Sequence, residues 1–169
     1  MRQFLALLIL VGAVASSIAQ DARIDSALRD AQTLIGAMQR FDTDGVASML
    51  YTAPFERMGV PINYMKEQAA QLDANLRSIG AKYLSFTLGT PTEPFTRPEG
   101  LFTLIPYTSV MTANGRTFQQ DAFFIAFSDD SGATWKFIDG IGTARRSIET
   151  ILPNYEGPDL PPIQRIAIP

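Results

Sequence analysis

The feature of this sequence that most constrains the fold is the pair Asn114-Gly115, which lies between two apolar runs. Both positions of a two-residue hairpin turn need positive φ, and Asn-Gly is the pair that supplies it most readily. If the residues flanking the turn face each other, Tyr107 faces Ala122 and the two runs pair along their length. The sequence therefore predicts a long antiparallel hairpin over residues 102–127.

Both faces of this predicted hairpin are apolar. Ile105 and Tyr107 fall on one face, and Phe123 and Ile125 fall on the other. A sheet covered by helices on one side normally exposes polar residues on its second side. We therefore expect the second face to line a cavity or to meet another subunit. The second possibility predicts a homodimer. The predicted interface has a polar rim, formed by Ser109, Gln120 and Lys136.

Helical periodicity precedes the hairpin. Apolar residues recur at steps of three and four over residues 24–38 and 65–79, and a shorter helix is expected over 43–50. Gly80 is typical of the end of the third helix. The period then changes to two over residues 82–88, which predicts a strand. The order indicates an α+β fold in which N-terminal helices pack on a curved antiparallel sheet, a cone with room for a pocket.

The composition excludes several classes of chemistry. The chain has no His and no Cys, so the usual zinc, haem and copper ligands are missing, as are His-based triads and Cys nucleophiles. The stretch FDTDG resembles part of a calcium loop, but an EF-hand alignment puts Arg40 and Tyr51 where carboxylates are needed. Asp42 or Asp44 is therefore interpreted as a helix cap. No metal and no cofactor is predicted.

The first residues predict export. Arg2 precedes an apolar run over residues 4–14, and Ser17 and Ala19 offer the small residues that a signal peptidase needs. The run is shorter than the roughly 20 residues of a membrane span, so no integral membrane segment is expected after cleavage. We expect a signal peptide at 1–19, a domain at 20–152 and a proline-rich extended tail at 153–169. The protein is then periplasmic or extracellular.

The net charge of −3 and the scattered cations make the chain a poor partner for nucleic acid. Two proline-rich segments are expected to lie at the surface. Residues 89–100 hold three prolines and predict a long loop rather than a central strand. The tail holds five prolines, but its isoleucines suggest that it adheres to the domain.

The stretch SDDSGATW, residues 128–135, fits the S-x-D-x-G-x-T-W pattern of the Asp-box that sialidase propellers repeat from blade to blade. A propeller needs several such blades, and this chain holds one copy in 169 residues. The box lies between two predicted strands, where a turn is required, and Asp130, Gly132 and Trp135 suit that turn. It is interpreted as a structural hairpin rather than as a glycan contact.

The stretches FDTDG and VASMLY, followed by LFTLIPY, NGR and AFFIAFSDDSGATWKFIDG, resemble the nuclear transport factor 2-like superfamily and its secreted bacterial members of undescribed function. The resemblance covers roughly residues 24–142. It implies a pocket between a concave sheet and the helices, and frequently a dimer. No catalytic motif of that superfamily can be carried over to this chain residue by residue.

Two carboxylates are the candidate catalytic residues. If Phe127 pairs with Trp135, then Asp139 faces Phe123 and becomes a diagonal neighbour of Asp121 on one apolar face. The two carboxylates of such a pair can have different pKa values, so that one acts as a general acid and the other as a general base. The alternative is that both carboxylates cap turns or accept hydrogen bonds at strand ends. The candidate ligand-binding residues are Tyr107, Phe123 and Trp135.

These features favour an exported module that binds a small hydrophobic molecule, or an accessory module, without recognised catalytic machinery. One alternative is a cofactor-free isomerase or dehydratase that uses the paired carboxylates. A second is a structural protein that interacts through its outer sheet face and tail.

Overall fold

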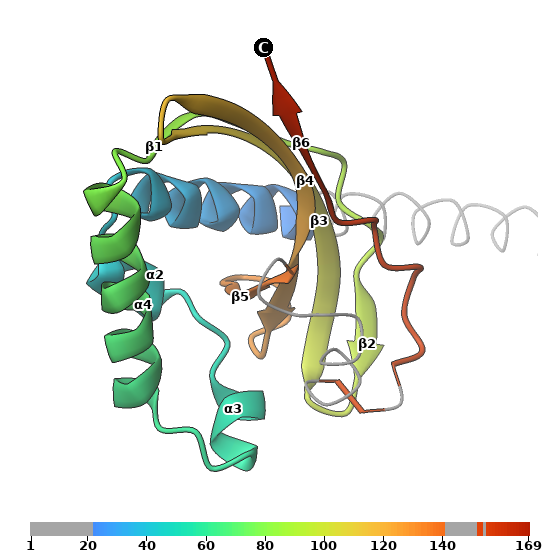
Figure 1. Cartoon of the computed structure of the whole chain (residues 1–169). Helices are drawn as coiled ribbons and strands as arrows, with labels where there is room; N and C mark the ends of the chain where they lie inside the picture. The colour runs from blue at the N-terminus through green and yellow to red at the C-terminus, as the bar shows by residue number, and fades with distance from the viewer. Residues whose placement is uncertain (1–21, 141–151, 154) are drawn as a thin grey trace, which may run out of the picture.

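A computed structural model describes residues 22–140, 152–153 and 155–169. It confirms the α+β fold, in which N-terminal helices precede a curved antiparallel sheet (Figure 1). The helices are residues 22–39, α2 (Thr43–Ser48), α3 (Ala53–Arg57) and α4 (Ile62–Ser78). The strands are β1 (Lys82–Leu88), β2 (Phe95–Arg97), β3 (Gly100–Ala113), β4 (Arg116–Ser128), β5 (Lys136–Asp139) and β6 (Gln164–Ile168).

The hairpin of β3 and β4 has the predicted register. Tyr107 pairs with Ala122, and the ladder runs from Ala113 and Arg116 at the turn to the far ends of both strands. Asn114 and Gly115 have φ of 50° and 70°, the left-handed backbone that this turn needs. The turn residues therefore set which side chains share a face.

The remaining strands pair with this hairpin. The order β1-β3-β4-β5 is completed by β2, which pairs with β3, and by β6, which pairs with β4. β5 pairs with residues 124–127 of β4, and β6 pairs with residues 117–121 of the same strand. These two short strands therefore lie along successive parts of β4. The sheet curves without closing into a barrel (Figure 1).

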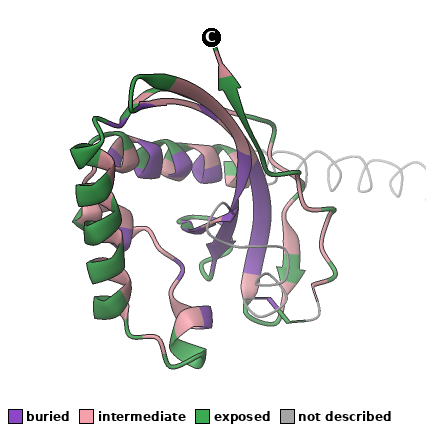
Figure 2. Ribbon diagram, in the orientation of Figure 1, coloured by how far each residue is buried: buried purple, intermediate pink, exposed green. Residues whose placement is uncertain are grey.

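The N-terminal helix packs on the concave side of the sheet, here called the inner face. Its small residues Ala27 and Ala31 are fully buried and let the helix approach closely, and Leu34 reaches the same core. The buried interior runs along the middle of the sheet (Figure 2). The strand residues of this core are Leu101, Ile105, Tyr107, Ala122, Phe124, Ala126 and Phe137, joined by Trp135.

The opposite side of the sheet, here called the outer face, is covered by other segments of the same chain. Tyr51 stacks on Phe127 with ring centroids 4.0 Å apart, and Phe95 contacts Phe102 at 5.9 Å. The covering side chains are Tyr51, Phe55, Phe95, Leu152, Tyr155 and Leu160. Because this chain itself covers the apolar face, the homodimer stays a prediction without a supporting contact.

Helix α4 stands apart from both cores. It has no buried residue (Figure 2). Leu72 on its apolar stripe is 58% exposed. Polar contacts attach it to the start of α2: Thr43 Oγ1 donates to Asp73 Oδ2 at 2.7 Å, and Lys66 Nζ lies 3.4 Å from Asp44 Oδ1. Gly80, with φ of 65°, follows the helix as predicted.

Local details both agree with and correct the sequence expectations. Asp42 is the helix cap, accepting from the N–H of Gly45 at 2.9 Å. Residues 89–100 are not wholly a loop, because β2 pairs there with the edge of β3. Pro54 lies in the first turn of α3, where its missing N–H costs nothing.

The tail is extended and attached to the domain, as its isoleucines suggested, and β6 adds it to the sheet beside β4 (Figure 1). The predicted signal peptide, residues 1–19, lies outside the described residues. Within the described part of the chain, no helix is both long enough and apolar enough to cross a membrane.

Candidate functional site

The Asp-box forms the turn between β4 and β5, and the carboxylate of Asp130 organises it. Oδ1 accepts from the N–H groups of Ala133 and Thr134 at 3.0 and 2.9 Å, and from Ser128 Oγ at 2.7 Å. Oδ2 accepts from Thr134 Oγ1 at 2.7 Å. The backbone N–H of Thr134 and these other donors hold the pKa of Asp130 well below its usual range.

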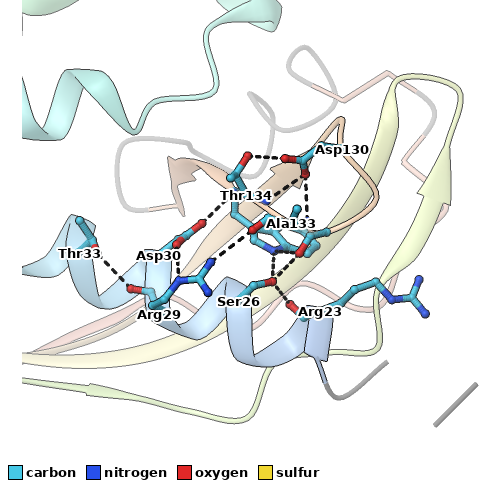
Figure 3. A network of polar contacts seen from close by, with 10 residues as sticks. Arg23, Ser26, Arg29, Asp30, Thr33, Asp130, Ala133 and Thr134 are labelled. Carbon is cyan, nitrogen blue, oxygen red and sulfur yellow. Dashed lines mark hydrogen bonds and ion pairs between the residues drawn. The ribbon is translucent and has the colours of Figure 1, made fainter. Parts of the chain in front are cut away.

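The same turn is fastened to the N-terminal helix (Figure 3). The N–H of Trp135 donates to Asp30 Oδ2 at 2.9 Å, and its indole Nε1 donates to Ser26 Oγ at 2.9 Å. Ser26 Oγ in turn lies 2.5 Å from the carbonyl oxygen of Gly132. Trp135 is 1% exposed. Both of its N–H groups are therefore used inside the fold.

Gly132 shows why the box contains glycine. Its φ is 96°, and a Cβ there would lie 2.5 Å from Cγ of Arg23 on the N-terminal helix. Both the backbone conformation and the close approach of the helix exclude a side chain. The interpretation of SDDSGATW as an element of the fold thus agrees with every contact that its residues make.

The register of β5 differs by one residue from the expectation. Phe127 pairs with Lys136, and Asp139 faces Phe124 rather than Phe123. The reason is that the turn is one residue longer than expected, because residues 128–135 lie between the paired residues Phe127 and Lys136. The N–H of Trp135, the last residue of this turn, bonds to Asp30 on the helix. A shift of one residue moves every side chain to the other face.

The two candidate carboxylates therefore lie on opposite faces of the sheet. Asp139 lies on the inner face, where Tyr107 Oη donates to its Oδ1 at 3.0 Å. Asp121 lies on the outer face, where its Oδ1 accepts from Thr108 Oγ1 at 2.8 Å. The structure does not bring Asp121 and Asp139 together, which removes the geometry of a carboxylate pair.

The candidate ligand-binding residues are also separated. Phe123 and Trp135 are each 1% exposed and belong to the cores of the outer and inner faces respectively. Tyr107 is 2% exposed and stacks on Phe124 at 4.4 Å. Burial, together with the charge and hydrogen bond of Asp139, raises the pKa of Tyr107 far above its ordinary value. Of the three, Tyr107 alone lines a cavity described below.

This cavity, here called the inner cavity, lies on the inner face beyond the end of the N-terminal helix. Its volume is about 30 Å³, room for one or two waters. The strands supply a row of paired residues across the sheet, in which Phe86 faces Ser109 and Gln120 faces Arg165. The lining side chains are Met38, Tyr83, Phe86, Tyr107, Ser109, Met111, Phe118, Gln120 and Arg165.

Four polar groups of the inner cavity have no hydrogen-bond partner among the described residues. They are the hydroxyls of Tyr83 and Ser109, the amide of Gln120 and the guanidinium of Arg165. Ser109 is only 4% exposed, and its hydroxyl opens to the cavity rather than being sealed in the core. Arg165 lies over the ring of Phe118, with Cζ 4.5 Å from the centroid. The cavity thus combines unused donors with apolar walls.

The positions predicted from the sequence for two of the cavity residues are wrong. Ser109 and Gln120 were predicted to lie on the rim of an outer interface, but they face inward and line the cavity. The register of the hairpin already puts them on the face of Tyr107, so this signal was present. Arg165 had no such signal, because nothing in the local pattern says that β6 joins β4 next to Gln120.

Neither a metal centre nor a relative identifies the site. Among the described residues, no group of three or more Asp and Glu side chains is placed to hold a metal ion. No family model, no curated protein and no solved structure matches this chain. The candidate function is therefore argued from the geometry of the inner cavity.

Proposed function

We propose that the protein is a non-catalytic module that binds a small organic anion through the inner cavity. The observation that carries the proposal is a set of polar groups around one cavity that have no hydrogen-bond partner among the described residues: Tyr83, Ser109, Gln120 and Arg165. A guanidinium, two hydroxyls and an amide all donate hydrogen bonds. Such a set suits a carboxylate, which only accepts them when ionised.

The apolar part of the lining defines the rest of the ligand. Met38, Phe86 and Phe118 surround the donors, and binding sites commonly combine apolar walls with a few placed polar groups. The cavity of about 30 Å³ is far smaller than a drug-sized pocket. We infer that it receives the carboxylate and that any larger part of the ligand lies outside it.

Calorimetric titration of the purified protein tests this proposal. We expect acetate and benzoate to bind saturably and benzyl alcohol, which lacks the charge, not to bind. Arg165→Met keeps the apolar stem and removes the charge, and should weaken benzoate binding about tenfold or more. Arg116→Met is the matched control, because Arg116 is exposed at the hairpin turn and does not line the cavity. Equal binding by the two variants would refute the proposal.

The location and family of the protein are proposals of the same kind. The charged and apolar start of the chain, with Ser17 and Ala19, supports export to the periplasm or beyond. Intact-mass measurement of exported protein should find a chain that begins at Gln20. The helices followed by a curved sheet support membership of the nuclear transport factor 2-like superfamily. The isomerase alternative loses its support, because Asp121 and Asp139 lie on opposite faces.

A further inference from the structure

A second cavity lies on the outer face and is not part of the inner cavity. It is a groove of about 220 Å³, here called the outer groove. β1, β3 and β4 contribute to it, and so does the tail before β6, which runs beside the sheet (Figure 1). Its lining includes Thr87, Pro106, Thr108, Asp121, Pro161 and Pro162.

Asp121 supplies the charge of this groove. It is half-buried and is the only charged residue among the described residues that line the groove. It stands in a row across the sheet in which Thr87 faces Thr108, and Thr108 faces Asp121. Its Oδ1 accepts from Thr108 Oγ1 at 2.8 Å and from Gln119 Nε2 at 3.4 Å. These two bonds orient the carboxylate.

The second oxygen of Asp121 is unused within the described chain. No hydrogen bond to Oδ2 and no ion pair of Asp121 is present there. A partly buried carboxylate is costly unless donors or an opposite charge compensate it. The groove therefore has an acceptor and a negative charge still to be matched.

The walls of the groove offer few donors of their own. Pro106, Pro161 and Pro162 have no backbone N–H, and the N–H of Gly89 is already bonded to the carbonyl oxygen of Pro106 at 2.7 Å. The hydroxyl of Thr108 is committed to Asp121. The hydroxyl of Thr87 is the remaining side-chain donor of the described lining, so a molecule that pairs with Oδ2 of Asp121 brings hydrogen-bond donors of its own.

We propose that the outer groove binds a small organic cation, a primary ammonium or a guanidinium with a short apolar body. The cationic N–H groups donate to Oδ2 of Asp121 and form a charge-assisted hydrogen bond. The apolar body packs against the rigid proline rings. The volume of about 220 Å³ lies below that of drug-sized pockets, which limits the ligand to a small molecule.

The test is an amide-resolved NMR titration of the purified protein with benzylammonium. We expect saturable shifts centred on Gly89, Thr108 and Asp121. Benzyl alcohol has a similar shape without the charge, so it should bind the same protein at least about tenfold more weakly. Both ligands are compared on the unmodified protein, so the result does not depend on whether a variant folds.

The variant Asp121→Asn keeps the size of the side chain and its bond from Thr108, and removes the charge. It should weaken benzylammonium binding about tenfold or more. Asp129→Asn removes a charge from an exposed position outside the groove and should leave binding unchanged. Equal binding of the alcohol and the ammonium, an unchanged affinity in Asp121→Asn, or shifts centred elsewhere would each overturn the proposal.

Discussion

The backbone N–H of Trp135 donates a hydrogen bond of 2.9 Å to Oδ2 of Asp30, a residue 105 positions earlier in the chain. This bond joins the N-terminal helix to the turn that starts β5, and it removes Trp135 from the ladder of β4. β5 begins at the next residue, Lys136, and Asp139 at its end faces the inner side of the sheet beside Tyr107. The bond from Trp135 to Asp30 therefore attaches the turn to the helix at the point where β5 begins.

Replacing Asp30 with Ala should destabilise the fold. The side chain of Asp30 is 16% exposed, and its loss leaves the N–H of Trp135 without a protein acceptor. We expect the free energy of unfolding to fall by about 1 to 3 kcal/mol, measured by urea denaturation. Asp25→Ala is the matched control, because Asp25 is exposed on the same helix. Equal effects of the two substitutions would show that the bond does not fasten the turn.

The Asp-box should make stability depend on pH in the acidic range. Hydrogen bonds lower the pKa of Asp130 in the folded state, so its contribution is complete above the unfolded pKa of about 4 and declines as pH falls below it. Asp130→Asn should lower the melting temperature at neutral pH, and the gap should close in acid. Asp129→Asn, at the exposed neighbouring position, should show no such gap. A gap of constant size across this range contradicts the account.

Tyr107 should affect stability at the opposite end of the pH range. Its raised pKa keeps it neutral in the fold, so its contribution is complete below the unfolded pKa of about 10 and declines as pH rises above that value. Tyr107→Phe should cost about 1 to 3 kcal/mol at neutral pH, because Asp139 loses a donor. Denaturant titrations at several pH values should show a smaller cost above about pH 10. A cost that grows with pH would be the opposite result.

The sequence predicts local geometry well where turn chemistry is decisive. Asn114 and Gly115 have the positive φ that a two-residue turn requires, and the register of β3 and β4 follows from them. The spacing of apolar residues likewise locates α4, and Gly80 marks its end. These features depend on neighbouring residues, so a single sequence contains the information.

Features that join distant segments were not predicted. The Asp-box turn is one residue longer than expected, so the predicted register of β5 was wrong by one residue. The bond that joins the end of this turn to Asp30 was not predicted either. The inner cavity depends on Arg165, which reaches Gln120 only because β6 adds to the edge of β4. Neither contact leaves a periodic signal in the sequence. Since a shift of one residue exchanges the faces of a strand, this small error misplaced a candidate site residue.

The most direct test of the central claim is an amide-resolved NMR titration of the protein with benzoate, which shows where the anion binds. We expect saturable shifts centred on Ser109, Gln120 and Arg165, with loss of these shifts in Arg165→Met and their retention in Arg116→Met. Benzyl alcohol should leave the same amides unmoved. Benzoate shifts that do not saturate, or that centre outside the inner cavity, would contradict the claim that this cavity binds small organic anions.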